Sequence, residues 1–194
     1  MAFKGIYRNK SSFFKGFIFL SLIFTSTIIH TLLAIVLVMF FSQGGFDIIQ
    51  NQDLNNQVSV NYLKMVQLFS GIGMFIVPSF IYSYLTNFNF NFNKISRQNS
   101  ILVIVIVMLI TPFIGLLLEW NMQIDFPDWI LYFDNNSEAI ILAFLKMESW
   151  LDLLYTMFVI AVIPAIGEEL IFRGYLQQKI SKRFGDMNAS IFIT

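Results

Sequence analysis

The segment Ile101-Leu-Val-Ile-Val-Ile-Val-Met-Leu-Ile110 is the clearest indication of the fold class, because it is an unbroken apolar run without a charge or a turn-forming residue. It lies inside a longer apolar segment that extends from about Ser100 to Leu118. A helix needs roughly 20 apolar residues to cross a bilayer core about 30 Å thick. The stretch therefore predicts a transmembrane helix.

Further apolar runs on both sides of this segment have the same character, at residues 16–41, 65–85 and 150–183, with the start of another at 188–194. The 194-residue chain is 57% hydrophobic and 12% charged, and contains 23 phenylalanines. A soluble domain has about 45–50% apolar and about 25% charged residues. We predict an all-α, polytopic transmembrane helix bundle, with residues 1–194 forming a single membrane domain. Because the last run is too short to cross a membrane, we expect the bundle to be incomplete.

Basic residues gather at alternate ends of the predicted spans. They precede the first span, lie between the second and third, and follow the fourth, with Lys64 and Lys146 as the exceptions. The other two connections carry most of the acidic residues. The positive-inside rule places the amino terminus, the second loop and the carboxyl end in the cytoplasm. The 12 basic and 12 acidic residues cancel, so we expect no nucleic-acid partner.

Three local patterns have structural interpretations. The alternation from Asn87 to Asn93 formally resembles a strand, but between two spans it indicates an interfacial loop with Phe side chains in lipid. The pair Gly71 and Gly73 indicates close helix packing rather than a nucleotide site. His30 lies mid-span, where a hydrogen-bonded packing role is favoured, and a proton-relay role stays open.

The segment 125–148 connects the third and fourth spans on the opposite face. It contains Pro127, Trp129 and two asparagines, followed by the apolar stretch Ala139 to Leu145. We expect an extracytoplasmic loop and then a short amphipathic helix that lies on the membrane or caps the bundle. Such a helix would cover a substrate entrance, and a plain surface connection is equally consistent with the pattern.

The chemistry of the chain is concentrated in Ala165-Ile-Gly-Glu-Glu-Leu-Ile-Phe-Arg-Gly-Tyr175. A charge at the centre of a bilayer costs about 2.5–3.5 kcal/mol on insertion scales. We therefore expect Glu168, Glu169 and Arg173 to pair with one another, to face a wet cavity, or to lie near the cytoplasmic interface.

Helix geometry gives the two acids different neighbours. Glu169 and Arg173 are four residues apart, in the favourable order for an ion pair. Glu168 is five residues from Arg173 and, at about 100° per residue, points about 140° away from it. We also expect Pro164 and Gly167 to kink or open the helix, which would bring the acids near a helix amino terminus. Spacing alone leaves an active site and a structural ion-pair cluster equally open.

The string Pro-Ala-Ile-Gly-Glu-Glu-Leu-Ile-Phe-Arg-Gly-Tyr-Leu-Gln at residues 164–177 resembles the first motif, E-E-x-x-x-R, of the CPBP family. These are the CAAX-protease and bacteriocin-processing intramembrane proteases, also called the Abi family. The basic stretch 179–185 is similar to the cytoplasmic turn of that family. The resemblance implies that Glu168 helps to activate a water molecule, and that Glu169 supports the site together with Arg173.

The histidine motifs that follow in this family are absent from residues 1–194, and His30 matches neither of them. We therefore expect an intramembrane endopeptidase of the type II CAAX prenyl endopeptidase kind, truncated before its histidine motifs and inactive as this chain alone. The resemblance implies a peptide or protein substrate, with a lipid modification as one option. It also leaves open a divalent metal such as zinc, for which no ligand is assignable here. We place the protein in the bilayer of a bacterial plasma membrane.

Two other classes stay open. The first is a non-catalytic membrane scaffold or bacteriocin-immunity protein, which would tolerate the loss of Glu168. The second is a small transporter, which would need paired broken helices. Charge is concentrated in the fourth span only, so the sequence does not favour a transporter.

Overall fold

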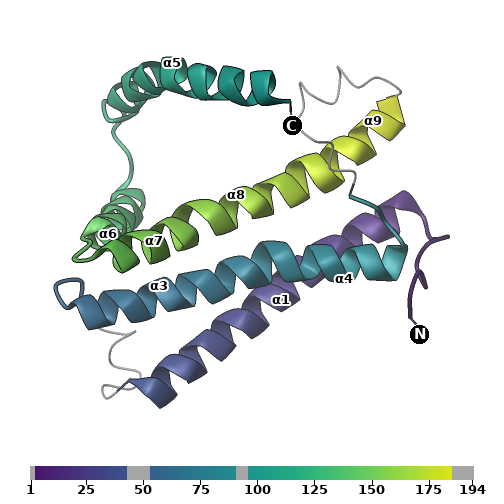
Figure 1. Ribbon diagram of the computed structural model, residues 1–194, viewed down its shortest axis with the longest axis horizontal. Coiled ribbons are helices and arrows are strands. Elements are labelled where there is room, and N and C mark those ends of the chain that lie inside the picture. Colours follow the sequence, from purple (N-terminus) through teal and green to yellow (C-terminus); the bar gives the residue numbers. More distant parts are fainter. Residues whose placement is uncertain (1–2, 43–52, 91–95, 185–194) are drawn as a thin grey trace. The chain divides into compact units, whose positions relative to one another are not determined.

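The computed structural model describes residues 3–42, 53–90 and 96–184, and these form helices joined by turns and loops without a strand among them. The first long helix is α1, Ser12–Phe41, whose first turn is capped by Ser11. The second is continuous through α3 (Gln57–Gly71), the π-helical segment η1 (Ile72–Ile76) and α4 (Val77–Thr86). Figure 1 shows these helices side by side. The predicted all-α fold class is confirmed for the described residues.

The remaining helices are α5 (Arg97–Asn121), α6 (Asp128–Leu145) and one long helix with several internal segments. That long helix runs through α7 (Trp150–Met157), η2 (Phe158–Val162), α8 (Ile163–Glu168), η3 (Glu169–Gln177) and α9 (Gln178–Phe184). Helices long and apolar enough to cross a membrane cover Ser12–Phe41, Gln57–Thr86, Arg97–Asn121 and Trp150–Ser181. The four complete predicted spans agree with these helices, and the short run at 188–194 lies outside the described residues.

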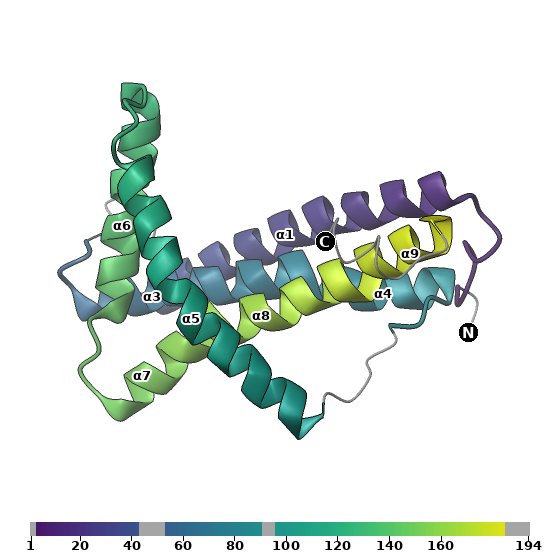
Figure 2. The ribbon, with the colours of Figure 1, turned by 90° about the horizontal axis from the view of Figure 1, so that it is seen from above.

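The chain divides into two compact units. The first contains Met1–Asn91 and Ile140–Thr194, and the second contains Phe92–Ala139. In the first unit α1, the α3–α4 helix and the α7–α9 helix pack together, as Figures 1 and 2 both show. The second unit holds α5 and the first part of α6, and within it α5 buries none of its residues. An apolar helix exposed on every side is suited to contact with lipid.

Small residues allow the helices of the first unit to approach closely. A Cβ atom added to Gly73 would lie 2.6 Å from the Cβ of His30, and one added to Gly71 would lie 3.0 Å from Cγ2 of Ile163. Real Cβ atoms essentially never come as close as 2.6 Å to another atom. A side chain at position 73 would therefore collide with His30, and glycine is needed there. The prediction that these two glycines serve helix packing is confirmed.

Two of the π-helical segments precede a proline. Pro78 follows η1 and Pro164 follows η2, and the carbonyl four residues before each proline lies inside the π-helical segment. Proline has no N–H and its ring clashes with that carbonyl, so the local widening accommodates the ring. Proline alone is insufficient, because Pro112 lies in uninterrupted α-helix within α5.

The expected opening of the helix at Pro164 and Gly167 is wrong. The backbone N–H of Glu169 donates to the carbonyl groups of Ala165 and Ile166, so α8 continues directly into η3. Glu168 and Glu169 therefore do not lie at a helix amino terminus with free N–H groups. The π-helical segment η2 accommodates the ring of Pro164, and the helix does not break there.

Two further expectations need correction. Residues 128–138 form helix rather than loop, because α6 begins at Asp128 directly after Pro127, a residue that is tolerated at a helix start. Phe88 and Phe90 are half-buried against the cluster of Phe19, Tyr82 and Tyr175 instead of being anchored in lipid. The described part of that loop, residues 87–90, contains no strand, and residues 91–93 lie outside the description.

Candidate active site

The motif residues lie on the long helix at the junction of α8 and η3. Arg173 Nη1 donates to Glu169 Oε1 at 2.9 Å, which confirms the ion pair predicted from the spacing. The two side chains keep 58% and 44% of their surface exposed. Such a pair contributes little to folding, so its main effect is to neutralise the carboxylate of Glu169.

Glu168 has a different environment. Its side chain is exposed and forms neither a hydrogen bond nor an ion pair with any described part of the chain. Arg173, the cation closest to it in sequence, is engaged by Glu169. The carboxylate of Glu168 is therefore available to accept a proton, as a general base must be.

The backbone around the motif is held by two phenylalanines, one from the second long helix and one from the loop that follows it. A Cβ atom on Gly167 would lie 2.2 Å from Cγ of Phe75, and one on Gly174 would lie 2.6 Å from Cδ1 of Phe90. The two glycines flank the acids and the arginine in sequence. Each phenylalanine ring occupies the space of a missing side chain, so the α8–η3 junction is pinned on both sides of the motif.

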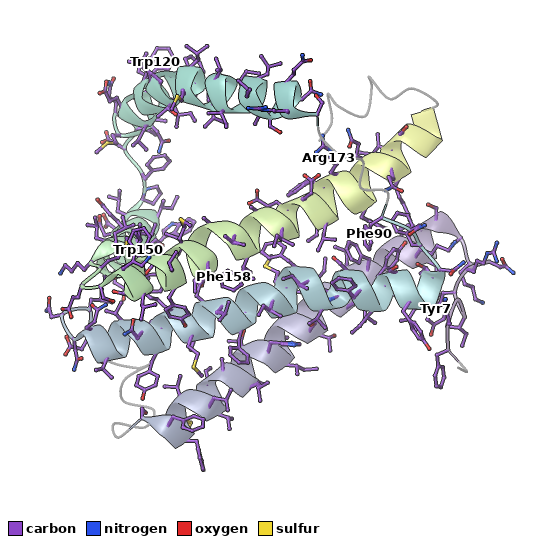
Figure 3. The ribbon with its side chains drawn as sticks, in the orientation of Figure 1. Tyr7, Phe90, Trp120, Trp150, Phe158 and Arg173 are labelled. Carbon is purple, nitrogen blue, oxygen red and sulfur yellow. The ribbon has the colours of Figure 1, made fainter. Side chains whose placement is uncertain are left out.

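Figure 3 labels Phe90 and Arg173 at the same end of the first unit. At that end Tyr175 packs with its ring centroid 4.3 Å from that of Phe19 and 5.1 Å from that of Tyr82. The helix face opposite Arg173 is thereby fixed to α1 and α4. Sequence analysis identified the polar residues and missed these aromatic supports, although the glycines on both sides of the motif were a signal that side chains from another helix approach there.

The motif helix adopts an unusual geometry at the site. The segment η3 starts at Glu169 and continues to Gln177 as π-helix, without a proline to cause it. The regular step of about 100° per residue therefore does not apply between Glu168 and Arg173. π-Helical turns occur frequently at functional sites, because they reorient side chains while the helix remains continuous.

His30 lies on α1, away from the motif in sequence. Its Nδ1 donates to the backbone oxygen of Ser26 at 2.8 Å, and the same nitrogen lies 3.3 Å from Oγ of Ser26. Its Cβ is the atom against which Gly73 packs. These contacts support the packing interpretation of His30.

A metal site would require several ligands in one place. Among the residues described, no group of three or more His, Cys, Asp and Glu side chains is gathered closely enough to hold a metal ion. At the motif itself, one of the two adjacent carboxylates is already engaged by Arg173. The ligand set of a zinc site is thus not supplied by the described residues.

A second polar cluster, which the sequence analysis missed, lies elsewhere in the first unit. Lys64 on α3 has a fully buried side chain whose Nζ donates to Oδ1 of Asp152 on α7 at 2.8 Å. Oδ2 of Asp152 accepts from Nε2 of Gln57 at 2.8 Å. The signal was present, since Lys64 was an exception to the charge pattern and charges within apolar helices usually pair. These contacts tie the beginning of the second long helix to the beginning of the fourth.

Comparison with known proteins bears on the fourth span. The family model described as Type II CAAX prenyl endopeptidase Rce1-like matches residues 150–194, a region that includes Glu168, Glu169 and Arg173. Neither the curated proteins nor the solved structures give a significant match. Residues 150–194 are thus similar to the Rce1-like, type II CAAX prenyl endopeptidase family, which confirms the family resemblance drawn from residues 164–177.

Proposed function

We propose that this chain carries the glutamate-bearing part of an intramembrane endopeptidase of the CAAX-processing type. The proposal rests on one observation, which is that the two glutamates of the motif have different environments. Arg173 neutralises Glu169, while Glu168 next to it has no partner among the described residues. The match of residues 150–194 to the Rce1-like model supports a protease at the family level.

In the proposed reaction Glu168 removes a proton from a water molecule as the water oxygen attacks the carbonyl carbon of the scissile peptide bond. The carbon–oxygen bond forms and the carbonyl becomes a tetrahedral oxyanion. When the carbon–nitrogen bond breaks, the amine leaves with the proton that Glu168 holds, and the carboxylate is regenerated. General acid–base catalysis of this kind contributes typically 10²–10⁴-fold to a rate.

Glu169 and Arg173 act as positioning residues in this scheme. Their ion pair keeps Arg173 away from Glu168, because the guanidinium is engaged at 2.9 Å by the neighbouring acid. The rings of Phe75 and Phe90 hold the helix on which all three residues lie. The substrate is a peptide or protein that reaches the membrane, and a prenylated carboxyl-terminal peptide is the first one to test.

The decisive experiment compares Glu168→Gln with Glu148→Gln in the protein as its gene encodes it, reconstituted in lipid. Glu148 is also exposed, so its substitution makes the same chemical change away from the motif. We expect cleavage of a farnesylated reporter peptide to fall at least about 100-fold in Glu168→Gln, in line with loss of a general base. Glu148→Gln should cleave normally.

Normal cleavage by Glu168→Gln would overturn the proposed role of this acid. If the wild-type protein cleaves neither the farnesylated peptide nor its unmodified counterpart, the scaffold or immunity function is favoured instead. We further propose that the polypeptide 1–194 alone hydrolyses neither peptide, because its one histidine is engaged with Ser26 and no second catalytic group lies in the motif. Cleavage by this polypeptide that depends on Glu168 would contradict that proposal.

A further inference from the structure

A polar pocket lies at one end of the first unit, where α1 begins and where α4 and α9 approach it. Its volume is about 320 Å³, which falls within the range of small-molecule sites. The residues of interest that line it are Arg8, Ser12, Lys15, Tyr82, Thr86 and Lys179. They come from three stretches that are far apart in the sequence.

The pocket carries three cations, and none of the described residues that line it is a carboxylate. None of these cations takes part in either ion pair of the described residues, which join Lys64 to Asp152 and Arg173 to Glu169. Lys179 Nζ donates to the carbonyl of Ser12 at 2.8 Å, and Lys15 Nζ donates to the carbonyl of Arg8. An ammonium has three N–H donors, so donors remain on both lysines. Like charges held together in this way are stabilised by an anion between them.

A second observation points to a ligand independently of the charge. The side chain of Tyr82 is fully buried, and no described residue forms a hydrogen bond of good geometry with its hydroxyl group, although the hydroxyl groups of Tyr175 and Thr86 are its polar neighbours. Buried polar groups in proteins are almost always hydrogen-bonded, since an unpaired one costs free energy. Tyr82 lines the pocket, so a ligand oxygen there would accept a hydrogen bond from its hydroxyl.

The position of the pocket identifies the source of the anion. It lies at the start of α1, the first of the helices long enough to cross a membrane. On the outer side of the same turns, Phe13 and Phe17 are exposed by 87% and 62%, as suits contact with acyl chains. The pocket thus lies where an apolar helix surface gives way to basic residues. Basic pockets between transmembrane helices at this level bind anionic lipid headgroups.

We propose that this pocket binds the phosphate of an anionic phospholipid headgroup. The cations contributed by Lys15 and Lys179 lie on two different long helices, and Arg8 precedes the first of them. A bound phosphate would bridge these elements and satisfy the hydroxyl of Tyr82. The inference does not rest on proteolysis, because it uses no residue of the motif.

The test is a titration of the purified chain in neutral-lipid nanodiscs with phosphatidylglycerol, followed by native mass spectrometry. We expect Arg8→Gln to weaken binding at least several-fold and the double variant Lys15→Gln, Lys179→Gln at least tenfold. Lys10→Gln is the matched control for Arg8→Gln, because Lys10 is exposed, precedes the same helix and does not line the pocket. Tyr82→Phe removes only the hydroxyl group and should weaken binding without loss of the helical circular dichroism.

Several outcomes would overturn the proposal. Equal weakening by Lys10→Gln and Arg8→Gln would show that binding follows general positive charge instead of the pocket. Displacement of phosphatidylglycerol by millimolar inorganic phosphate would assign the pocket to a free anion. Arg8 is exposed and lies outside the helices, so its variant remains informative even if the double lysine variant fails to fold.

Discussion

The buried pair of Lys64 and Asp152 gives the sharpest test of the fold. Lys64 has a side-chain exposure of 0% and Asp152 of 10%, and their charged atoms are 2.8 Å apart. Asp152→Leu would leave the ammonium group buried without its carboxylate, next to the ring of Phe144, whose centroid is 6.0 Å away. Removing one partner of a buried ion pair costs about 3–5 kcal/mol. We therefore expect the folding equilibrium to shift by roughly two to four orders of magnitude, at about 1.4 kcal/mol for each factor of ten.

The reciprocal change should cost less. In Lys64→Met the carboxylate of Asp152 keeps the hydrogen bond from Gln57 at 2.8 Å. It also lies in the first turn of α7, where the helix dipole favours a negative charge. The double variant Lys64→Met, Asp152→Leu leaves no unpaired charge, and replacement of a buried ion pair by apolar residues is often neutral or stabilising. We expect its stability to lie close to that of the wild type.

The four proteins can be compared by titration with sodium dodecyl sulfate in mild detergent micelles, with circular dichroism as the signal. Lys146→Met and Glu148→Leu are matched controls, because both residues are exposed. The reasoning would be refuted if Asp152→Leu unfolded together with the Glu148→Leu control. It would also be refuted if the double variant were as unstable as the sum of the two single changes, since residues in contact should show strong coupling.

Two further substitutions test the support of the motif. Gly167→Ala would place a Cβ atom 2.2 Å from Phe75 Cγ, so we expect overpacking to lower the free energy of unfolding by about 1–3 kcal/mol. Gly115 has open space around it, so Gly115→Ala should be neutral or slightly stabilising in the same titration. Arg173→Gln should change stability by less than about 1 kcal/mol, as expected for an exposed pair, while lowering peptide cleavage. The double change Arg173→Gln, Glu169→Gln should recover part of that cleavage, because it returns the net charge of the motif to its wild-type value. A double variant that cleaves no better than Arg173→Gln would contradict the neutralising role.

The spans and the Glu169–Arg173 pair were predictable because each depends on local sequence. A transmembrane helix requires only apolar length, and an ion pair at four-residue spacing requires only a helix. The same reasoning distinguishes Glu168 from Glu169 on the basis of sequence alone. The sequence pattern predicts a loop where the helix starts at Asp128, since Pro127 and two asparagines are typical of loops although a helix also tolerates them.

The contacts that fix the motif helix were not predictable, because they join residues distant in sequence. Phe75 and Phe90 belong to the second long helix and the loop after it, and each fills the space beside a glycine of the fourth. Hydrophobicity alone cannot distinguish a phenylalanine that faces lipid from one that packs on a glycine, since both surroundings are apolar. For this reason the Phe90 region was assigned to lipid, and the structure places it against Tyr175 instead.

The π-helical geometry of η3 changes the reason why Glu168 forms no ion pair with Arg173. In a regular helix Glu168 would be turned away from Arg173 by its position alone. In a π-helix hydrogen bonds join residues five apart, which is the separation between Glu168 and Arg173, so the angular argument weakens. Competition accounts for the lack of an ion pair between Glu168 and Arg173 in this geometry, because Glu169 already holds the guanidinium at 2.9 Å. We therefore propose that the second glutamate of the motif protects the first from neutralisation, a role that requires a negative charge and that glutamine at the same position would not perform.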